Sequence, residues 1–344
     1  MRPVLAVTMG DPAGIGAEIS VKALEHEEVY RECIPYVIGD RCALENAVAF
    51  TGGRLKLRSV EQTGQLRGEF GTVEYFDSKC LRKNGWEYGK VSAACGNAAF
   101  QYIKKAIELA LKHEVLGVVT APINKEALHK AGYRYSGHTE IFADLTGCKK
   151  YAMMLLGRSL RVIHVTTHVP LRRACDLVKR DRVRDVIQLA HDALGLMGIP
   201  NPRIAVAGLN PHSSEDGLFG DEEEKEIIPA IRDAARLGIC VEGPVPPDTV
   251  FVKAVGGQYD IVVAMYHDQG HIPMKLCGFK MDPATRAFTS VSGVNCTVGL
   301  PIIRTSVDHG TAFDKAATGT ANEESMVEAI GTAARMAKRK YALS

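Results

Sequence analysis

The run from Tyr259 to Ala264 places the strongest constraint on the fold. It is short, apolar and rich in β-branched residues, a pattern typical of a strand buried on both faces of a parallel sheet. The segment that follows, residues 265–275, carries four polar side chains of catalytic type: His267, Asp268, His271 and Lys275. Open α/β sheets bind ligands beyond the carboxyl ends of their strands. The sequence therefore predicts an α/β fold with a functional loop after this strand.

Further apolar runs alternate with amphipathic helical patterns along the chain. Strands are predicted at residues 4–9, 35–38, 73–76, 116–121, 151–156, 161–166, 203–209 and 239–242. Helices are predicted at residues 17–26, 43–50, 91–113, 141–145, 183–197 and 323–340. Residues 151–166 are expected to form a hairpin, and residues 278–292 a surface loop or flap. A chain of 344 residues with this pattern divides into about two domains.

Charge and cysteine content exclude several kinds of partner. The chain has 42 lysines and arginines against 40 acids, and this small net charge predicts no nucleic-acid or membrane partner. The nine cysteines are scattered without a Cys-x-x-Cys pair, which is typical of a reduced, cytoplasmic protein. The first apolar run is too short for a signal peptide, and no segment approaches the roughly 20 apolar residues of a membrane span.

The glycine-rich turn at residues 10–16, Gly-Asp-Pro-Ala-Gly-Ile-Gly, matches a dinucleotide-binding fingerprint only in part. It lacks the third glycine, and no clean acidic strand end follows it. We therefore predict a strand-to-helix turn at the edge of a cleft and no Rossmann site.

Two helix starts are further candidates for a binding site. Lys125 follows Thr-Ala-Pro-Ile-Asn and either reaches the cleft or lies on a solvated helix face. Residues 136–140, Ser-Gly-His-Thr-Glu, would present free backbone N–H groups and hydroxyls to an anion. The alternative that the sequence favours there is an ordinary N-cap with a capping box formed by Glu140.

Three predicted strands are each followed by a histidine. The strands end near residues 167, 209 and 265, and the histidines are His168, His212 and His267. A single histidine of this kind is more often a hydrogen-bonded structural residue. Three in the same topological position indicate a common metal site. Three imidazole ligands with one open position are typical of a catalytic zinc or a similar divalent ion.

Positive charge near the same loop predicts the kind of substrate. Gly270 and Pro273 argue against a regular helix, so His271 is assigned to the surroundings of the metal or to the substrate and not to the ligand set. Lys275 and Arg304 lie among apolar neighbours without an adjacent acidic residue. Together with the helix start at residues 136–139 they predict a small anionic substrate.

Acidic residues elsewhere are interpreted more simply. The acidic segment 215–226 has its carboxylates near the favourable N-terminal end of a predicted helix and is interpreted as a solvated helix start. Asp248 follows a rigid proline-rich loop and either faces the cleft or caps the next helix.

Ordered motifs spread over nearly the whole chain resemble those of a known family. They are GDPAGIG at 10–16, TAPINK at 120–125, SGHT at 136–139, TTH at 166–168, NPH at 210–212, YHDQG at 266–270 and RTSVDHG at 304–310. With these motifs the chain resembles the 4-hydroxythreonine-4-phosphate dehydrogenase family. This family comprises enzymes of pyridoxal-phosphate biosynthesis and their 4-phospho-D-threonate and 4-phospho-D-erythronate dehydrogenase relatives.

The resemblance implies a two-domain α/β fold like that of isocitrate and isopropylmalate dehydrogenases, without a Rossmann dinucleotide domain. Residues 1–129 and 300–344 would build one domain and residues 130–299 the other. The site would lie in the cleft and at the interface of a homodimer with shared active sites. The segment 309–322 resembles the adenine-side NAD loop of those dehydrogenases. The implied cofactor contacts are His309, Gly310, Thr311, Ala312 and Asn322.

The resemblance also implies a reaction and a role for individual residues. The family oxidises the C3 alcohol of a 4-phosphorylated acid with NAD or NADP, and the β-keto acid then loses CO₂. The implied metal ligands are the same three histidines, with Zn²⁺, Mg²⁺ or Co²⁺ as the ion. The implied substrate and phosphate contacts are His138, Thr139, Lys275, Asn295 and Arg304. The candidate catalytic residues are Asp248, Asp268 and Lys275, the two carboxylates for proton transfer or substrate hydrogen bonding.

Departures from the vitamin-pathway enzymes bear on the substrate. Residues 280–292 resemble an insertion, and His271-Ile-Pro-Met replaces a more apolar stretch. Both features are closer to the phospho-threonate and phospho-erythronate branch, whereas Ala17 in place of the usual proline is a small change at a helix start. The resemblance thus implies 4-phospho-D-threonate or erythronate, or 4-phosphohydroxy-L-threonine, as the substrate. A metal-dependent hydrolase of a small phosphorylated substrate, and more remotely a phosphate-binding module, are the alternatives.

Overall fold

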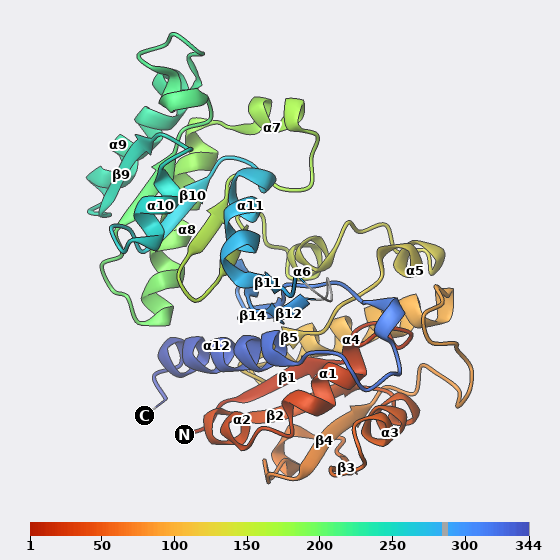
Figure 1. Ribbon diagram of the computed structural model, residues 1–344. Coiled ribbons are helices and arrows are strands. Elements are labelled where there is room, and N and C mark those ends of the chain that lie inside the picture. Colours follow the sequence, from red (N-terminus) through yellow and green to blue (C-terminus); the bar gives the residue numbers. More distant parts are fainter. Residues whose placement is uncertain (284–287, 344) are drawn as a thin grey trace. The chain divides into compact units, whose positions relative to one another are not determined.

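The computed structural model describes residues 1–283 and 288–343, which form two compact units (Figure 1). Unit 1 comprises residues 1–148 and 300–344, and unit 2 comprises residues 149–299. The sequence places the first boundary earlier, between residues 129 and 130. Helix α6 (His138–Leu145) belongs to unit 1, where the ring of its buried Phe142 lies 5.6 Å from the guanidinium of Arg304.

Unit 1 is built on a parallel sheet with the strand order β3-β4-β2-β1-β5-β14. The strands are β1 (Val4–Thr8), β2 (Ile34–Gly39), β3 (Lys56–Ser59), β4 (Thr72–Asp77), β5 (Gly117–Thr120) and β14 (Arg304–Val307). The residues of β5 and β14 are all buried, as expected for central strands of a parallel sheet. The fold is therefore mixed α/β, as the sequence predicts.

Helices flank this sheet. They are α1 (Gly16–Ala23), α2 (Glu27–Glu32), α3 (Arg41–Phe50), α4 (Ala93–Leu111), α5 (Lys125–Lys130), α6 and α12 (Glu324–Lys340), with short 3₁₀ turns at Thr63–Gln65 and Phe313–Lys315. Helices α1, α3, α4, α6 and α12 agree with the predicted segments to within a few residues, whereas α2 was not predicted. Helix α4 begins after Ser92, whose Oγ accepts a hydrogen bond from the Cys95 N–H at 3.2 Å.

Unit 2 contains strands in the order β13-β6-β7-β10-β8-β9. They are β6 (Ala152–Leu156), β7 (Arg161–His164), β8 (Ile204–Ala207), β9 (Val241–Val245), β10 (Ile261–Ala264) and β13 (Val294–Val298). β6 pairs antiparallel with both β7 and β13, which confirms the predicted hairpin. β7, β10, β8 and β9 are parallel, so their carboxyl ends lie at one edge.

The helices of unit 2 are α7 (Leu171–Leu177), α8 (Arg180–Met197), α9 (Ile228–Arg236), α10 (Val250–Val255) and α11 (His267–Gly278), with a 3₁₀ turn at Pro211–Ser214 and a π-helical turn at Glu223–Ile227. Residues 278–292, expected to form a surface loop or flap, contain two short strands, β11 (Phe279–Met281) and β12 (Phe288–Val291), which pair antiparallel. Residues 284–287 of that predicted insertion lie outside the described residues. Within the described ranges, no helix is both long and apolar enough to cross a membrane.

Candidate active site

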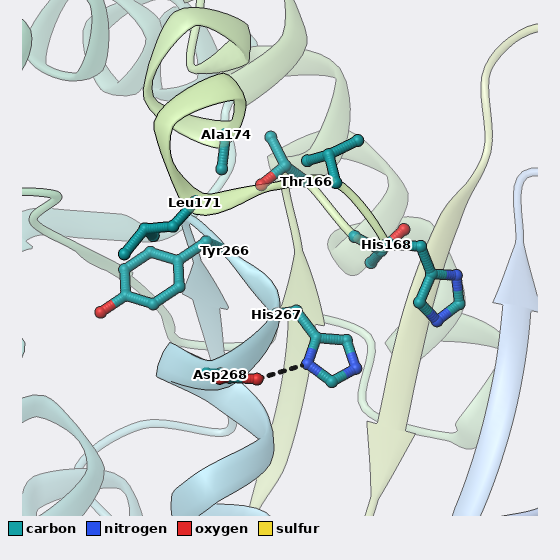
Figure 2. A pocket seen from close by; sticks show the side chains of 9 residues that line it. Thr166, His168, Leu171, Ala174, Tyr266, His267 and Asp268 are labelled. Atoms are coloured by element: carbon teal, nitrogen blue, oxygen red, sulfur yellow. Dashed lines mark hydrogen bonds and ion pairs between the residues drawn. The ribbon is translucent and has the colours of Figure 1, made fainter.

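His267 is the first residue of α11 and lies three positions after the last residue of strand β10 (Figure 2). Its Nδ1 lies 2.7 Å from Asp268 Oδ1, the contact drawn in Figure 2. Its ring stacks on that of His271, with centroids 3.6 Å apart. The argument against a regular helix here is wrong, because Gly270 and Pro273 both lie inside α11. His271 therefore shares a helix face with His267, one turn further along.

Contacts to the sheet explain why α11 forms despite these two residues. Gln269 is buried; its Oε1 accepts from the Met265 N–H at 2.6 Å and its Nε2 donates to the Gly208 carbonyl at 2.8 Å. Gly270 packs against β7 so closely that a Cβ there would lie 2.4 Å from Nε2 of His164. Tertiary contacts thus override the low helix propensity of this segment.

His164 forms the floor under the first turn of α11. It is fully buried, and its Nδ1 lies 3.2 Å from the carbonyl oxygen of Met153. Burial, with a smaller contribution from the nearby His271, lowers the pKa of His164 to about 3. The imidazole is therefore neutral and serves as a packing surface below His267.

His168 follows β7 and lies beside His267. Their ring centroids are 5.6 Å apart, and Figure 2 shows the two rings on the same side of the strand ends. They line a pocket of about 300 Å³. Its other lining residues are Thr166, Thr167, Val169, Leu171, Ala174, Tyr266 and Asp268. His168 has a φ of 42°, a left-handed backbone that few non-glycine residues adopt.

His212 lies in a left-handed turn that begins after β8. Five consecutive non-glycine residues, 212–216, have φ between 44° and 71°. A left-handed conformation costs roughly 1–2 kcal/mol for each such residue, and strained backbone of this kind clusters at functional sites. His212 Nδ1 lies 2.8 Å from Glu215 Oε1, and its ring contacts Phe219 at a centroid distance of 6.3 Å.

Glu223 anchors the segment that leads into this turn. It is 1% exposed, and its Oε1 accepts from the N–H groups of Leu209 at 2.7 Å and Asn210 at 2.8 Å. Its Oε2 accepts from Asn210 Nδ2 at 2.8 Å. The interpretation of the whole segment 215–226 as solvated is therefore wrong at Glu223, whose carboxylate replaces water with three hydrogen bonds.

The donors fit a divalent ion in kind. Nδ1 of His212 and of His267 each contacts a carboxylate, which leaves Nε2 to bind a metal, the usual arrangement of metal-bound histidines. The ring separation of His168 and His267 is compatible with one ion that both imidazoles bind at about 2.1 Å. Among the described residues of one chain, however, no three His, Cys, Asp or Glu side chains form a group that could hold a metal. The three-histidine set thus stays a prediction.

In unit 1, Arg304 is the first residue of β14 and is 3% exposed. Its Nη2 donates to Thr120 Oγ1 at 2.8 Å. Its guanidinium lies on the ring of Phe142 in a cation–π contact. A buried arginine at the carboxyl-end region of β5 is well suited to grip a phosphate or carboxylate.

The start of helix α6 lies close to this arginine. Burial lowers the pKa of His138 well below its usual value, and the charge of Arg304 adds to the effect. His138 Nε2 is buried and has no hydrogen-bond partner among the described residues. The predicted capping box is wrong, because the N-cap residue is Gly137, which has no side chain. Thr139 is buried in the same first turn.

The exposed Lys125 belongs to the surroundings of this helix start. Its Cε lies 4.0 Å from the position that a Cβ on Gly137 would occupy. Of the two alternatives left open by the sequence, the side chain thus extends towards the first turn of α6, where the anion-binding groups lie.

The remaining predicted contacts lie in unit 2. Lys275 is in α11, with its Nζ 4.2 Å from the ring centre of Phe279. Asn295 is in β13, opposite Leu155 of β6. Asp248 is exposed, and it does not cap α10, because the N-cap residue of that helix is Thr249.

The predicted cofactor loop, residues 309–322, is anchored at several points within unit 1. The Thr311 carbonyl accepts from the Ile15 N–H at 3.1 Å, so the glycine-rich turn packs on the loop. Glu18 is buried and accepts from the N–H groups of Gly319 at 3.3 Å and Ala321 at 2.8 Å. Asn322 Oδ1 accepts from the Glu324 N–H at 2.8 Å, at the start of α12.

The first part of the loop leaves room for a ligand. His309 Nδ1 contacts the carbonyl of Gly310 at 3.1 Å, and Ala312 is left-handed with a φ of 41°. A Cβ at Gly310 would meet nothing within 4 Å, so there is open space beside the loop. This open space is compatible with the predicted cofactor contacts, which stay a prediction.

Sequence reasoning missed three acidic residues at or near these sites. Glu215 and Glu223 contact the His212 segment, as described above. Asp11 is 1% exposed in the glycine-rich turn, where its Oδ1 accepts from the Ala13 N–H at 2.8 Å. Burial raises the pKa of Asp11 to about 6. The presence of an acidic residue in an otherwise apolar turn was the one feature of the sequence that could have indicated Asp11.

Known proteins match this chain over almost its whole length. The family model described as pyridoxal phosphate biosynthetic protein PdxA matches residues 31–333. A relative from Cupriavidus necator named D-threonate 4-phosphate dehydrogenase is 47% identical over 98% of each chain. One of the same name from Salmonella typhimurium is 49% identical over 97% of this chain and 98% of its own.

Solved structures resemble the fold equally completely. The crystal structure of a 4-hydroxythreonine-4-phosphate dehydrogenase from Klebsiella pneumoniae has a TM-score of 0.86 and 45% identity, and the match covers 98% of both chains. The arrangement of strands and helices described above is thus shared with proteins that carry this name.

Proposed function

The chain belongs to the PdxA family, and we propose that it is a dehydrogenase that acts on D-threonate 4-phosphate. As a member of this family it is an oxidoreductase that acts on a CH–OH group by oxidative decarboxylation. The observation that carries the choice of substrate is the match, at 47–49% identity over the whole length, with relatives named for this substrate. 4-Phosphohydroxy-L-threonine, the substrate implied by the names of the solved structures, is the competing choice within the same reaction class.

We assign the substrate phosphate to the cluster around Arg304 in unit 1. A buried guanidinium binds a phosphate through charge-assisted hydrogen bonds. The first turn of α6 adds His138 and Thr139 at a helix N-terminus, which favours an anion. Because His138 is kept neutral by its burial, it contributes a hydrogen bond and no second charge. Lys275 and Asn295 are also proposed as substrate contacts.

We assign a divalent metal, Zn²⁺, Mg²⁺ or Co²⁺, to His168, His212 and His267. Two predicted ligands, His168 and His212, have left-handed backbones, and two, His212 and His267, have Nδ1 on a carboxylate. Within the described residues of one chain no three such side chains form a metal-binding group, and we propose that a homodimer with shared active sites completes the ligand set. NAD or NADP would bind along residues 309–322.

The proposed chemistry divides between the substrate and a few side chains. The C3 alcohol loses a proton and a hydride to become a ketone, and the β-keto acid releases CO₂; a proton then returns to C2. When bound, the metal would polarise the C3 oxygen and the oxidised nicotinamide would accept the hydride. Asp248 and Asp268 are our candidates for moving the protons, with Lys275 as an alternative donor. Asp268 contacts His267 through one carboxylate oxygen, and we propose that its second oxygen contacts the substrate.

The experiment is a side-by-side assay of NADH or NADPH formation with D-threonate 4-phosphate and 4-phosphohydroxy-L-threonine. We expect faster turnover of D-threonate 4-phosphate, with dihydroxyacetone phosphate and CO₂ as products, and loss of turnover in His212→Ala and after treatment with a chelator. Inactivity on both substrates with both cofactors would overturn the assignment. Hydrolysis of a phosphorylated substrate without nicotinamide would favour a hydrolase instead.

A further inference from the structure

Two of the three predicted metal ligands are held in the same way. His212 Nδ1 contacts Glu215 at 2.8 Å, and His267 Nδ1 contacts Asp268 at 2.7 Å. In both cases the carboxylate belongs to the same short segment as the histidine. An imidazole that donates its Nδ1–H to a carboxylate is fixed in one tautomer, with the Nε2 lone pair open.

The backbone around His212 makes the contact with Glu215 possible. The left-handed turn over residues 212–216 brings side chains three positions apart to the same side, as a helical turn does. No glycine relieves this conformation between His212 and Asp216. Such a turn persists only where its surroundings over-determine it.

Glu223 is the main contact that fixes the start of the turn. Its buried carboxylate accepts three hydrogen bonds, from the N–H groups of Leu209 and Asn210 and from the Asn210 side chain. These residues link β8 to His212, so the carboxylate sets where the turn leaves the sheet. A structural role alone would explain Glu223, but not the paired and half-exposed contact of Glu215 with the imidazole.

We infer that Glu215 and Glu223 are positioning residues for His212: Glu223 holds the backbone of the turn, and Glu215 orients the imidazole so that Nε2 faces a divalent metal ion. The inference rests on the proposed metal site. Without the Glu215 carboxylate, the His212 ring is free to rotate and to change its tautomer. The affinity for the metal then falls although no ligand has been removed.

The test is a Zn²⁺ titration of the metal-free full-length protein against a chromophoric chelator, without substrate or nucleotide. Glu215→Ala is expected to bind Zn²⁺ about 10- to 100-fold more weakly than the wild type. Glu215→Gln retains an acceptor for Nδ1–H and is expected to recover most of the affinity. Because the pair is exposed, the unfolding midpoint of metal-free Glu215→Ala should stay within about 3 °C of the wild type.

Two further variants complete the test. Glu223→Gln is expected to weaken Zn²⁺ binding and also to lower the unfolding midpoint, since its carboxylate is buried. Glu224→Ala removes an exposed carboxylate from the same acidic segment and should change neither quantity. It controls for the loss of one negative charge.

Three outcomes would overturn the inference. They are wild-type Zn²⁺ affinity in Glu215→Ala, an equal loss of affinity in Glu224→Ala, and a fall in the unfolding midpoint of Glu215→Ala large enough to account for its weaker binding. The proposed reaction is tested separately. NADH formation by a Glu215→Ala protein with unchanged Zn²⁺ affinity would refute the positioning role of Glu215 and support the reaction. A wild type that binds Zn²⁺ but oxidises neither substrate would refute the reaction without refuting the positioning role.

Discussion

Replacing Gly270 by alanine tests whether the close packing of α11 on β7 positions His267. An added Cβ would lie 2.4 Å from His164 Nε2 and 2.6 Å from Val162 Cγ1. Both neighbours are completely buried, so neither side chain can move into solvent. The helix must therefore shift away from the strand, and His267 shifts with its first turn.

The size of the effect follows from two opposing contributions. Overpacking a buried site costs about 1–3 kcal/mol, whereas alanine is favoured over glycine inside a helix by about 1 kcal/mol. Two contacts far below van der Waals distance place the cost in the upper part of its range. We expect a net loss of about 1–2 kcal/mol, which corresponds to a fall of roughly 2–8 °C in the unfolding midpoint of a unit of this size.

Differential scanning calorimetry, with the two units fitted as separate transitions, measures this loss. The matched control is Gly195→Ala in α8, where a Cβ would meet nothing within 4 Å. This control should raise the midpoint, because only the helix-propensity gain applies. Zn²⁺ affinity should fall in Gly270→Ala and stay unchanged in Gly195→Ala. A Gly270→Ala protein as stable as the control, with wild-type Zn²⁺ affinity, would refute the reasoning.

Three further predictions concern other contacts. Burial raises the pKa of Asp11 from 3.8 to about 6, so its stabilising contribution is complete below pH 4 and is lost as the pH rises through 6. The free energy of unfolding of Asp11→Asn, measured by urea titration, should therefore exceed that of the wild type by up to about 3 kcal/mol at pH 8 and by little at pH 4. Arg304→Met should raise KM for the phosphorylated substrate at least about 10-fold and leave KM for the nucleotide unchanged, with Arg304→Lys between the two in steady-state assays. Gln269→Ala leaves the Met265 N–H and the Gly208 carbonyl unsatisfied and should lower the unfolding midpoint, measured by calorimetry. Gln269→Glu should lower it as well, because it places a carboxylate oxygen against the Gly208 carbonyl.

The strands and the histidines that follow them could be predicted from the sequence for a physical reason. A strand buried on both faces, such as 261–264, is a continuous apolar run, and the chain must turn polar where the sheet ends. Parallel neighbouring strands end at the same edge of the sheet, so the residues after β7, β8 and β10 lie at that edge. This prediction requires no knowledge of the loop structure. Helix α11 was missed because local propensity at Gly270 and Pro273 opposed contacts that only the folded sheet supplies.

The orientation of the histidines could not be predicted in this way. The charges of Glu215, Glu223 and Glu224 are equivalent in the sequence, yet one carboxylate contacts an imidazole, one is buried under a turn and one is exposed. What separates them is the left-handed backbone of residues 212–216, which no glycine announces. Sequence pattern thus indicates which residues reach the end of the sheet. The direction in which an imidazole nitrogen points depends on contacts between residues up to 14 positions apart along the chain, such as Leu209 and Glu223.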